Sequence, residues 1–554
     1  MRAMQIADRF SGGSFPPSLG TGSPDIARQL RQQKVRHRLI WLSRTVGLWW
    51  YRILLIVLAA AIATFEGQSG YFDLKILVGG AVGIVLFFMA IRRVEFGIVL
   101  AAIITTPLVP PIGQLKSLQL HAIELLLVIL FITLLVQTAF GAREPVLPSI
   151  QAIWPQIGLI IMAFASTIAV QLTWTPGVPH KIITNPIIFD EIYGVVLYFV
   201  PLLIIIVTTA ALTYKEKMIE YIQYGFLSAA LICALIVIAR FKTIGADIYT
   251  FRFSEPSIGY MSLRALAQII ALGTMIAYAN LLYARSWLLR LVYGIAMITC
   301  LLAIYFTLEN SWWLEVGLAL IIITIIFSRR LFVLFMACAI PMLPLIKAGI
   351  EKIAQVKAAD YYRLIIWKDA LRVWSKQPIF GVGAGDFWAY DQRFTQLPLT
   401  LHNCDKTGLC VAHNGYLQLL GELGPMGVIL ILSFIVVIIV IGIMLYRRSQ
   451  VKMIPGGTFL DKLGLGLYVE SPQRHDRILA MICVGLICGS AVGDFFSGSF
   501  FLQPRQIGST IGLPQVITSW IMWGCLIYKD KLWRITREKA ISDEKVVRAN
   551  EAGS

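Results

Sequence analysis

Charged side chains are scarce in this chain. They make up 14% of its 554 residues, whereas hydrophobic residues make up 58% and the mean hydropathy is +0.75. A water-soluble fold with this balance could not cover its surface with polar groups. Apolar runs of about 20 residues recur instead, the length of helix that crosses a bilayer. Because lipid offers the backbone no hydrogen bonds, the sequence predicts an all-α, polytopic transmembrane helical bundle.

Acidic residues are scarcer than basic ones. The chain has 31 Asp and Glu against 48 Lys and Arg, a formal net charge of +17. In a membrane protein such an excess indicates basic loops on the cytoplasmic side, and we expect no nucleic acid partner. The basic stretch from Arg28 to Arg44 favours a juxtamembrane helix that contacts anionic membrane lipids.

The first 45 residues contain no long apolar run, since the first such run begins near Val46. We therefore expect no signal peptide and interpret residues 1–45 as a basic, partly disordered cytoplasmic tail. Residues 46–346 hold eleven expected spans and residues 425–528 hold three, about fourteen in all. The expected spans are roughly 46–65, 74–91, 95–110, 118–140, 156–173, 190–212, 218–240, 259–283, 287–308, 312–328, 331–346, 425–446, 478–497 and 510–528.

Lys and Arg gather on alternate loops, which places both termini in the cytoplasm. On this topology residues 447–477 include a cytoplasmic loop and residues 529–554 form a cytoplasmic tail. Residues 347–424 form a large outer loop that is partly helical and unexpectedly basic. An anionic substrate would explain these outer cations, and so would a merely solvated surface.

Cysteines are few and mostly apolar in context. Six of the eight lie in apolar runs and behave as small hydrophobes. Cys404 and Cys410 lie close together in the polar outer loop, where an oxidising compartment would allow a disulfide. The sequence leaves open whether they are bridged.

Familiar metal and nucleotide motifs are missing. The chain has no HExxH motif and no Cys/His cluster, so we expect neither a metal nor a cofactor. The glycines of Gly381-Val382-Gly383-Ala384-Gly385 follow no expected strand, so they predict a tight backbone path rather than a dinucleotide site. We also find no internal repeat of the kind that many transporters carry.

The polar stretch 361–427 stands out against this apolar background. Arg363, Trp367, Ala370, Leu371 and Trp374 recur at helical spacing, which predicts an amphipathic helix at the membrane interface, ended by Pro378. Simple interfacial packing would explain the tryptophans but not an arginine on the same face.

A second polar signal follows. Asn414, Gln418 and Glu422 form a stripe beside His413, and Gly424-Pro425 then ends this helix before an apolar span. His402-Asn403 repeats the His-Asn pair, so position alone does not choose between the two histidines. For Glu422 the alternative to a functional role is a helix-end residue that faces water. In a later span, Gly485, Gly489 and Gly493 favour close helix packing.

These residues resemble a known family. RLIIWKDALRVWSKQPIFGVGAGDF followed by HNGYLQLLGELGPMG is similar to the O-antigen ligase and polymerase superfamily over about 65 residues. RFSEPSIGYMSLRALAQ, at 252–268, is similar to a second family segment, although the usual Asn is not found. In the family the large loop is periplasmic, and the protein lies in the bacterial inner membrane.

The resemblance implies a metal-independent, inverting glycosyltransferase that uses an undecaprenyl-diphosphate-linked glycan as donor. It implies His413 as general base, Arg252 and Arg363 as diphosphate ligands with Arg264 as a further candidate, and Glu422 as an orienting residue. The acceptor would be lipid A–core or another glycan. Ligase and polymerase, of O-antigen or exopolysaccharide, remain open, with protein O-glycosylation as a third option. The rival from another class is a transporter or flippase of lipid-linked glycans.

Overall fold

The computed structural model of the chain describes sixteen stretches, and only these are discussed below. They are residues 93–104, 113–115, 118–120, 122–139, 144–172, 188–213, 215–244, 257–258, 261–307, 310–339, 359–387, 390–391, 412–454, 461, 463–497 and 513–553. The contacts divide the chain into two units, one of Met1–Ile84 with Leu135–Glu144 and one of Val85–Leu134 with Pro145–Ser554. Everything that follows concerns the second unit unless stated.

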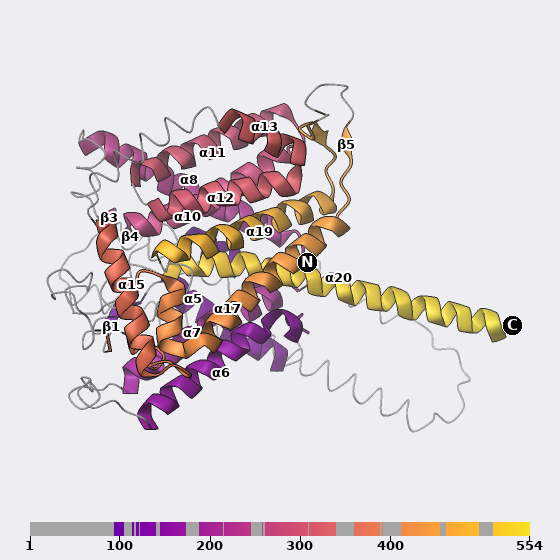
Figure 1. Ribbon diagram of the computed structural model, residues 1–554. Helices are drawn as coiled ribbons and strands as arrows, with labels where there is room; N and C mark the ends of the chain where they lie inside the picture. Colours follow the sequence, from indigo (N-terminus) through magenta and orange to yellow (C-terminus); the bar gives the residue numbers. More distant parts are fainter. Residues whose placement is uncertain are drawn as a thin grey trace, which may run out of the picture. The chain divides into compact units, whose positions relative to one another are not determined.

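Helices dominate the described residues (Figure 1), which confirms the all-α class. Each expected span from the third onward falls on one of them, while the spans at 46–65 and 74–91 lie outside the described residues. The helices are α4 (Val94–Ile104), α5 (Ala122–Ala139, which runs on into the first unit), α6 (Ile150–Leu172), α7 (Ile188–Leu212), α8 (Met218–Ile244), α10 (Leu263–Leu282), α11 (Trp287–Thr307), α12 (Asn310–Phe327), α13 (Arg329–Ala339), α15 (Ala359–Lys376), α17 (Gly415–Arg448), α19 (Pro472–Ser497) and α20 (Leu513–Gly553).

Six of these helices are long and apolar enough to cross a membrane. Their candidate spans are residues 150–170, 194–212, 218–243, 287–307, 415–448 and 472–495. Shorter apolar helices occupy 125–139, 266–282 and 311–327. The protein is therefore a multi-pass helical membrane protein. The apolar runs become helices because a helix satisfies all its backbone hydrogen bonds within one segment.

Short β-hairpins, which the sequence did not predict, connect some of the described helices. β1 (Gly113–Leu115) pairs antiparallel with β2 (Leu118–Leu120), and β3 (Ser257–Ile258) with β4 (Met261–Ser262). β5 (Met453–Ile454) pairs with β6 (Leu467–Tyr468) between α17 and α19. Strands of two or three residues are too short to show the alternating pattern by which strands are recognised.

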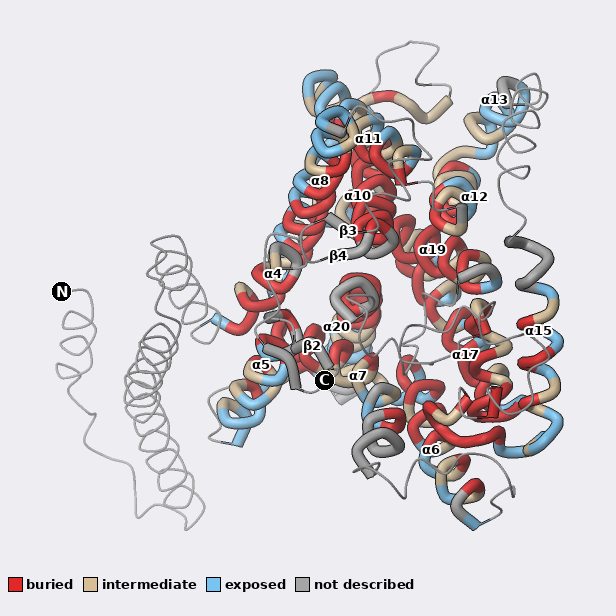
Figure 2. The backbone as a smooth tube through the Cα atoms, turned by 90° about the vertical axis from the view of Figure 1, so that its left-hand side faces the viewer, coloured by how far each residue is buried: buried red, intermediate tan, exposed pale blue. Residues whose placement is uncertain are grey.

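Helix α10 forms the centre of the packing, and Figure 2 shows it almost entirely buried. It packs against α8, α11, α12, α19 and α20. Helix α17 packs against α6, α15, α19 and α20, so it links the outer-loop helix α15 to the bundle. Of the residues expected to form the site, Glu422 lies in α17 and His413 lies just before its start.

The glycine stripe of α19 lies against α12, as the sequence predicted. A Cβ at Gly489 would lie 2.6 Å from the carbonyl oxygen of Glu315, and one at Gly493 would lie 2.9 Å from Glu315 Oε2. Ser490 Oγ donates a hydrogen bond of 2.7 Å to Glu315 Oε1. The glycines thus make room for both the α12 backbone and a buried carboxyl side chain.

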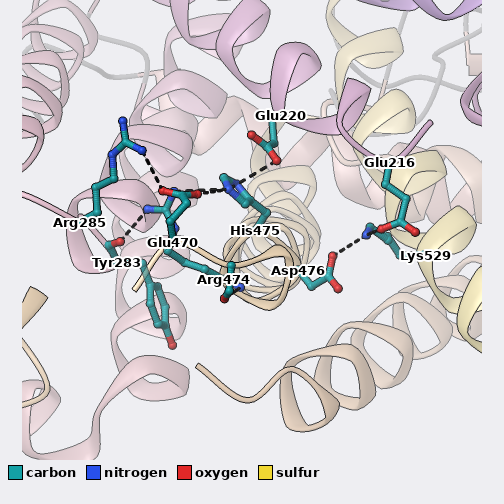
Figure 3. Close-up of polar contacts among 10 residues, drawn as sticks. Glu216, Glu220, Tyr283, Arg285, Glu470, Arg474, His475, Asp476 and Lys529 are labelled. Carbon is teal, nitrogen blue, oxygen red and sulfur yellow. Dashed lines mark hydrogen bonds and ion pairs between the residues drawn. The ribbon is translucent and has the colours of Figure 1, made fainter. Parts of the chain in front are cut away.

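Ion pairs join the helix ends on the side expected to face the cytoplasm (Figure 3). Glu470 accepts from Arg474 at 2.9 Å and lies 2.6 Å from His475 Nε2 and 3.4 Å from Arg285. The buried Arg474 also donates to the carbonyl oxygen of Tyr283 at 2.8 Å. Because a buried cation is costly unless it is paired, this network holds α19 against the end of α10.

A second cation is paired in the same region. Lys529, at the point where α20 leaves the core, contacts Asp476 at 2.8 Å and Glu216 at 2.5 Å. Beyond it α20 continues without a break to Gly553, and its residues 536–548 are exposed. Most of the expected tail 529–554 is thus the continuation of α20.

We expect Gly489→Ala to destabilise the protein by about 1–3 kcal/mol, because the methyl group would press on the backbone of α12. Thermal unfolding in detergent measures this. Gly317→Ala is the matched control, since a Cβ at that α12 position meets nothing within 4 Å. Equal melting temperatures for the two variants would contradict the close packing.

Candidate functional site

Helix α15 confirms the amphipathic helix expected over 361–374, whose spacing left open which side packs on the protein. Ile366, Ala370 and Val373 are buried, whereas Leu371 is 44% exposed. Leu364, two turns before Leu371, is also exposed. The helix therefore packs on the protein with one stripe and presents a second apolar stripe outward, as a helix at a membrane interface does.

A small apolar core joins the helix that begins the polar stretch, α15, to the segment around His413. It consists of Ala370 and Val373 from α15, Val382, Phe387 and Tyr390 from the segment after it, and Ala412 before α17. Leu417 of α17 packs against it. Segments 361–386 and 413–424, which the sequence suggested as separate pieces, are thus one packed unit.

The glycine turn after α15 lies directly on the backbone of α17. Gly381, Gly383 and Gly385 have φ of 76°, 106° and 82°, a region that disfavours residues with a Cβ. Val382 N–H donates to the carbonyl of Gly421 at 2.8 Å, and Gly383 N–H to that of Glu422 at 3.2 Å. A Cβ at Gly381 would collide with the backbone of Glu422. The tight path predicted for these glycines is confirmed.

These bonds require α17 to be interrupted. Gly424 has φ 69° and ψ −170°, so the helix is broken there and resumes at Pro425. The sequence predicted an end at this place, and the structure shows a kink between two helical parts. The carbonyls of Gly421 and Glu422 are thereby free to accept from the glycine turn, because no intact helix claims them.

Ser166 of α6 fastens this contact. Its Oγ donates to the carbonyl of Glu422 at 2.6 Å and accepts from Gly383 N–H at 3.1 Å. One buried hydroxyl from a membrane helix therefore bonds to both the glycine turn and α17. The role of Ser166 could not be predicted from the sequence, because its hydrogen bonds are to backbone atoms more than 200 residues away.

Glu422 is buried, with 1% of its surface exposed, so the alternative in which it faces water is wrong. Its Oε2 accepts from Tyr198 of α7 at 3.0 Å, and its Oε1 accepts from Gln418 at 2.6 Å. The Gln418 side-chain oxygen in turn accepts from Ala412 N–H at 3.0 Å. A chain of hydrogen bonds therefore runs from the bundle to the residue beside His413.

His413 has an unusual backbone. Its φ of 49° makes it the only non-glycine residue with positive φ in the described part of the chain. The next residue, Asn414, caps α17: its Oδ1 accepts from the N–H groups of Tyr416 and Leu417, each at 3.0 Å. His413 is thus a half-buried residue held in the left-handed region just before a helix start, and such conformations cluster at functional sites.

The structure describes the other candidate site residues only in part. Arg363 lies in α15, one turn before Trp367, and Arg264 is the second residue of α10, directly after β4. Their side chains lie outside what the structure describes. Arg252, His402, Cys404 and Cys410 lie outside the described residues altogether.

A buried acidic pair in the same region escaped the sequence interpretation. Asp369 of α15 is 1% exposed and accepts from Arg372 at 2.8 Å, while Asp391 is 3% exposed. Burial, with the nearby charge of Asp369, raises the pKa of Asp391 to about 7. Two aspartates 22 positions apart show no spacing rule, so only the packing reveals the pair.

Comparison with known families bears on this arrangement. The sequence model of a family described as O-antigen ligase matches residues 258–432, from β3 to the middle of α17. The match assigns residues 258–432 of the chain to the O-antigen ligase superfamily. No curated protein matches the chain.

Members of this superfamily are membrane glycosyltransferases, either ligases or polymerases. The matched region of this O-antigen ligase-type chain contains Arg264, Arg363, His413 and Glu422, whereas Arg252 lies before it. It also contains the whole glycine turn and the kink at Gly424. Helix α15, the glycine turn and the start of α17 therefore lie within the matched region, whereas Ser166 and Tyr198, which bond to them, lie before it.

We expect Glu422→Gln to weaken the hold on the segment before α17. An amide would turn a donor toward Tyr198 or Gln418, and a buried polar group left unsatisfied costs about 1–3 kcal/mol. Limited proteolysis and thermal unfolding measure the change. The exposed Glu538→Gln is the control, and unchanged stability of Glu422→Gln would show that these bonds do not hold the segment.

The pH dependence of the outer segment follows from Asp391. In an unfolded chain its carboxyl is ionised above about pH 4, whereas in the folded protein it stays protonated up to about pH 7. The folded state holds the extra proton between these values, so its stability falls as pH rises from about 4 to about 7.

Asp391→Asn should flatten this slope in hydrogen exchange of residues 359–391, and the exposed Asp543→Asn should not. A slope that survives in Asp391→Asn would assign it to another group.

Proposed function

We propose that this O-antigen ligase-type protein transfers a glycan from a polyprenyl diphosphate carrier, undecaprenyl diphosphate, to a hydroxyl of an acceptor glycan or lipid A–core. The reaction takes place at the periplasmic face of the bacterial inner membrane, with both termini in the cytoplasm. The observation that carries this proposal is the packing of α15, the glycine turn and the start of α17 into one unit. That unit connects the helix of Arg363 to the segment of His413.

His413 is proposed as the general base. A sugar hydroxyl is a weak nucleophile, and a positioned imidazole that takes its proton makes it a competent one. The oxygen then forms a bond to the anomeric carbon as the bond from that carbon to the diphosphate oxygen breaks. The lipid diphosphate leaves with the electron pair, and attack from the opposite side inverts the configuration.

Arginines are proposed to bind the leaving diphosphate. Guanidinium groups bind phosphate oxygens in pairs and stabilise the charge that develops as the bond breaks. Arg363, Arg252 and Arg264 are the candidates. Arg363 lies in the second turn of α15, which packs against α17, and Arg264 is the second residue of α10. With this arginine set, the proposed reaction needs no metal ion.

Glu422 is proposed to act through Gln418 rather than on the substrate. The bonds from Tyr198 to Glu422 to Gln418 to Ala412 N–H hold the backbone next to His413. A base must be held within hydrogen-bonding reach of the hydroxyl, and this chain supplies the rigidity. Glu422 is thus a positioning residue.

We expect His413→Ala to lower glycan transfer by at least about a hundredfold, because general base catalysis contributes that much or more. Purified protein would be incubated with a lipid-diphosphate glycan and lipid A–core, and product would be measured without any ion gradient. His402→Ala is the matched control, and its activity should remain near that of the wild type.

Loss of activity in His402→Ala with full activity in His413→Ala would reassign the base. Elongation of the carrier-linked glycan in place of transfer to lipid A–core would make the protein a polymerase. Movement of the lipid-linked glycan across vesicles without product would make it a transporter.

A further inference from the structure

Three aromatic side chains from separate elements meet beside the proposed site. Trp367 of α15 and Phe495 of α19 have ring centroids 6.1 Å apart at an interplanar angle of 87°. Tyr416 of α17 lies 5.8 Å from Phe495. We call Trp367, Tyr416 and Phe495 the aromatic platform.

Two residues of the platform are close in sequence to the proposed diphosphate ligand Arg363 and the proposed base His413. Trp367 is one turn after Arg363 on α15, about 6 Å along the helix axis. Tyr416 is in the first turn of α17, three residues after His413. Phe495 lies at the end of α19. The platform is therefore beside a proposed diphosphate ligand and the proposed base, where the outer ends of these helices converge.

The rings are fixed but not enclosed. Tyr416 donates its hydroxyl hydrogen bond to the carbonyl of Ala491 at 2.7 Å, which sets the ring against α19. Phe495 remains 50% exposed, although its neighbour Asp494 is fully buried. Half of the Phe495 surface is therefore accessible, unlike that of a ring that only fills a core.

Polar groups surround the platform. Trp367 Nε1 is buried and meets no hydrogen-bond acceptor among the residues that the structure describes. Asp494, the residue before Phe495, lies close enough to Tyr416 to interact with it electrostatically, and Glu315 accepts from Ser490 one turn earlier on α19. Ionisable groups at this depth of a membrane protein mark substrate sites rather than lipid contacts. An aromatic surface with polar neighbours suits a sugar, which has apolar C–H faces and hydroxyl edges, better than an isoprenoid chain.

We propose that the aromatic platform binds the first sugar of the donor, the ring attached to the diphosphate. This rests on the proposed function, because Arg363 would hold the diphosphate one turn away. The ring stacks on Trp367 and Phe495, and one of its hydroxyl oxygens accepts a hydrogen bond from Trp367 Nε1. Binding this sugar sets which face of the anomeric carbon is presented to the acceptor hydroxyl activated by His413.

The test compares Trp367→Ala and Phe495→Ala with the conservative Trp367→Phe and Phe495→Tyr. The alanine variants should raise the KM for the donor about tenfold, with the KM for the acceptor unchanged, and the conservative variants should restore most of the affinity. Tyr305→Ala is the matched control, since Tyr305 is also 50% exposed and stacks on a tryptophan, Trp313, at 5.4 Å. Thermal unfolding of each variant separates loss of binding from loss of fold.

Two competitors identify which part of the donor is bound. Lipid-free repeat-unit oligosaccharide should inhibit transfer less well in Trp367→Ala than in the wild type, and undecaprenyl diphosphate should inhibit both equally. The reverse pattern would mean that the platform binds the lipid and would overturn the proposal.

Direct binding of the oligosaccharide, measured without turnover, tests the platform even if no transfer is found. Unchanged binding in both alanine variants would refute the platform while the loss of transfer in His413→Ala left the proposed function standing.

Discussion

The approach of the glycine turn to the backbone of α17 is the contact on which the rest of the site depends. Gly381 lies so close to Glu422 that any side chain at 381 would separate them, and the break at Gly424 leaves carbonyls that the turn can bind. Ser166 bonds to both partners. The outer segment is therefore attached to membrane helices by backbone bonds, which vary little with side-chain identity but demand glycine at a few positions. An intact helix in place of this kink could not bind the turn.

Buried charge has two distinct uses in this chain. At the end expected in the cytoplasm, Arg474 and Lys529 are paired with Glu470, Glu216 and Asp476, and these pairs join the ends of helices. Near the proposed site, Glu422 is satisfied by neutral donors, Tyr198 and Gln418. The first arrangement joins the ends of the helices, and the second holds the segment before α17 through Gln418 and Ala412 N–H.

Much of the fold could be predicted from the sequence, for a physical reason. Lipid imposes a length and a composition on each span, so apolar runs between 95 and 528 predicted where the helices lie. The ends were less well predicted, since α17 begins at Gly415 rather than near 425 and α20 continues to Gly553 rather than ending near 528. The helix over 361–374 and the break at Gly424-Pro425 followed from local periodicity and backbone chemistry. The side of α15 that packs on the protein was not predicted: Ala370 is buried and Leu371 exposed, although helical spacing puts both on one face. An interfacial helix has two apolar surfaces, one toward protein and one toward lipid, and spacing does not distinguish them.

The sequence by itself determined the class of protein, the positions of most helices, the superfamily and the two segments that carry polar residues. Each of these depends on local composition or on a short motif. Only the tertiary structure decided that the two segments are one unit, that Glu422 is buried, and that Ser166 and Tyr198 belong to its surroundings. It also decided that Asp369 and Asp391 share one region and that three aromatic rings meet at the helix ends. Such contacts join residues 20 to more than 200 positions apart, and no local pattern encodes which distant helix packs against which.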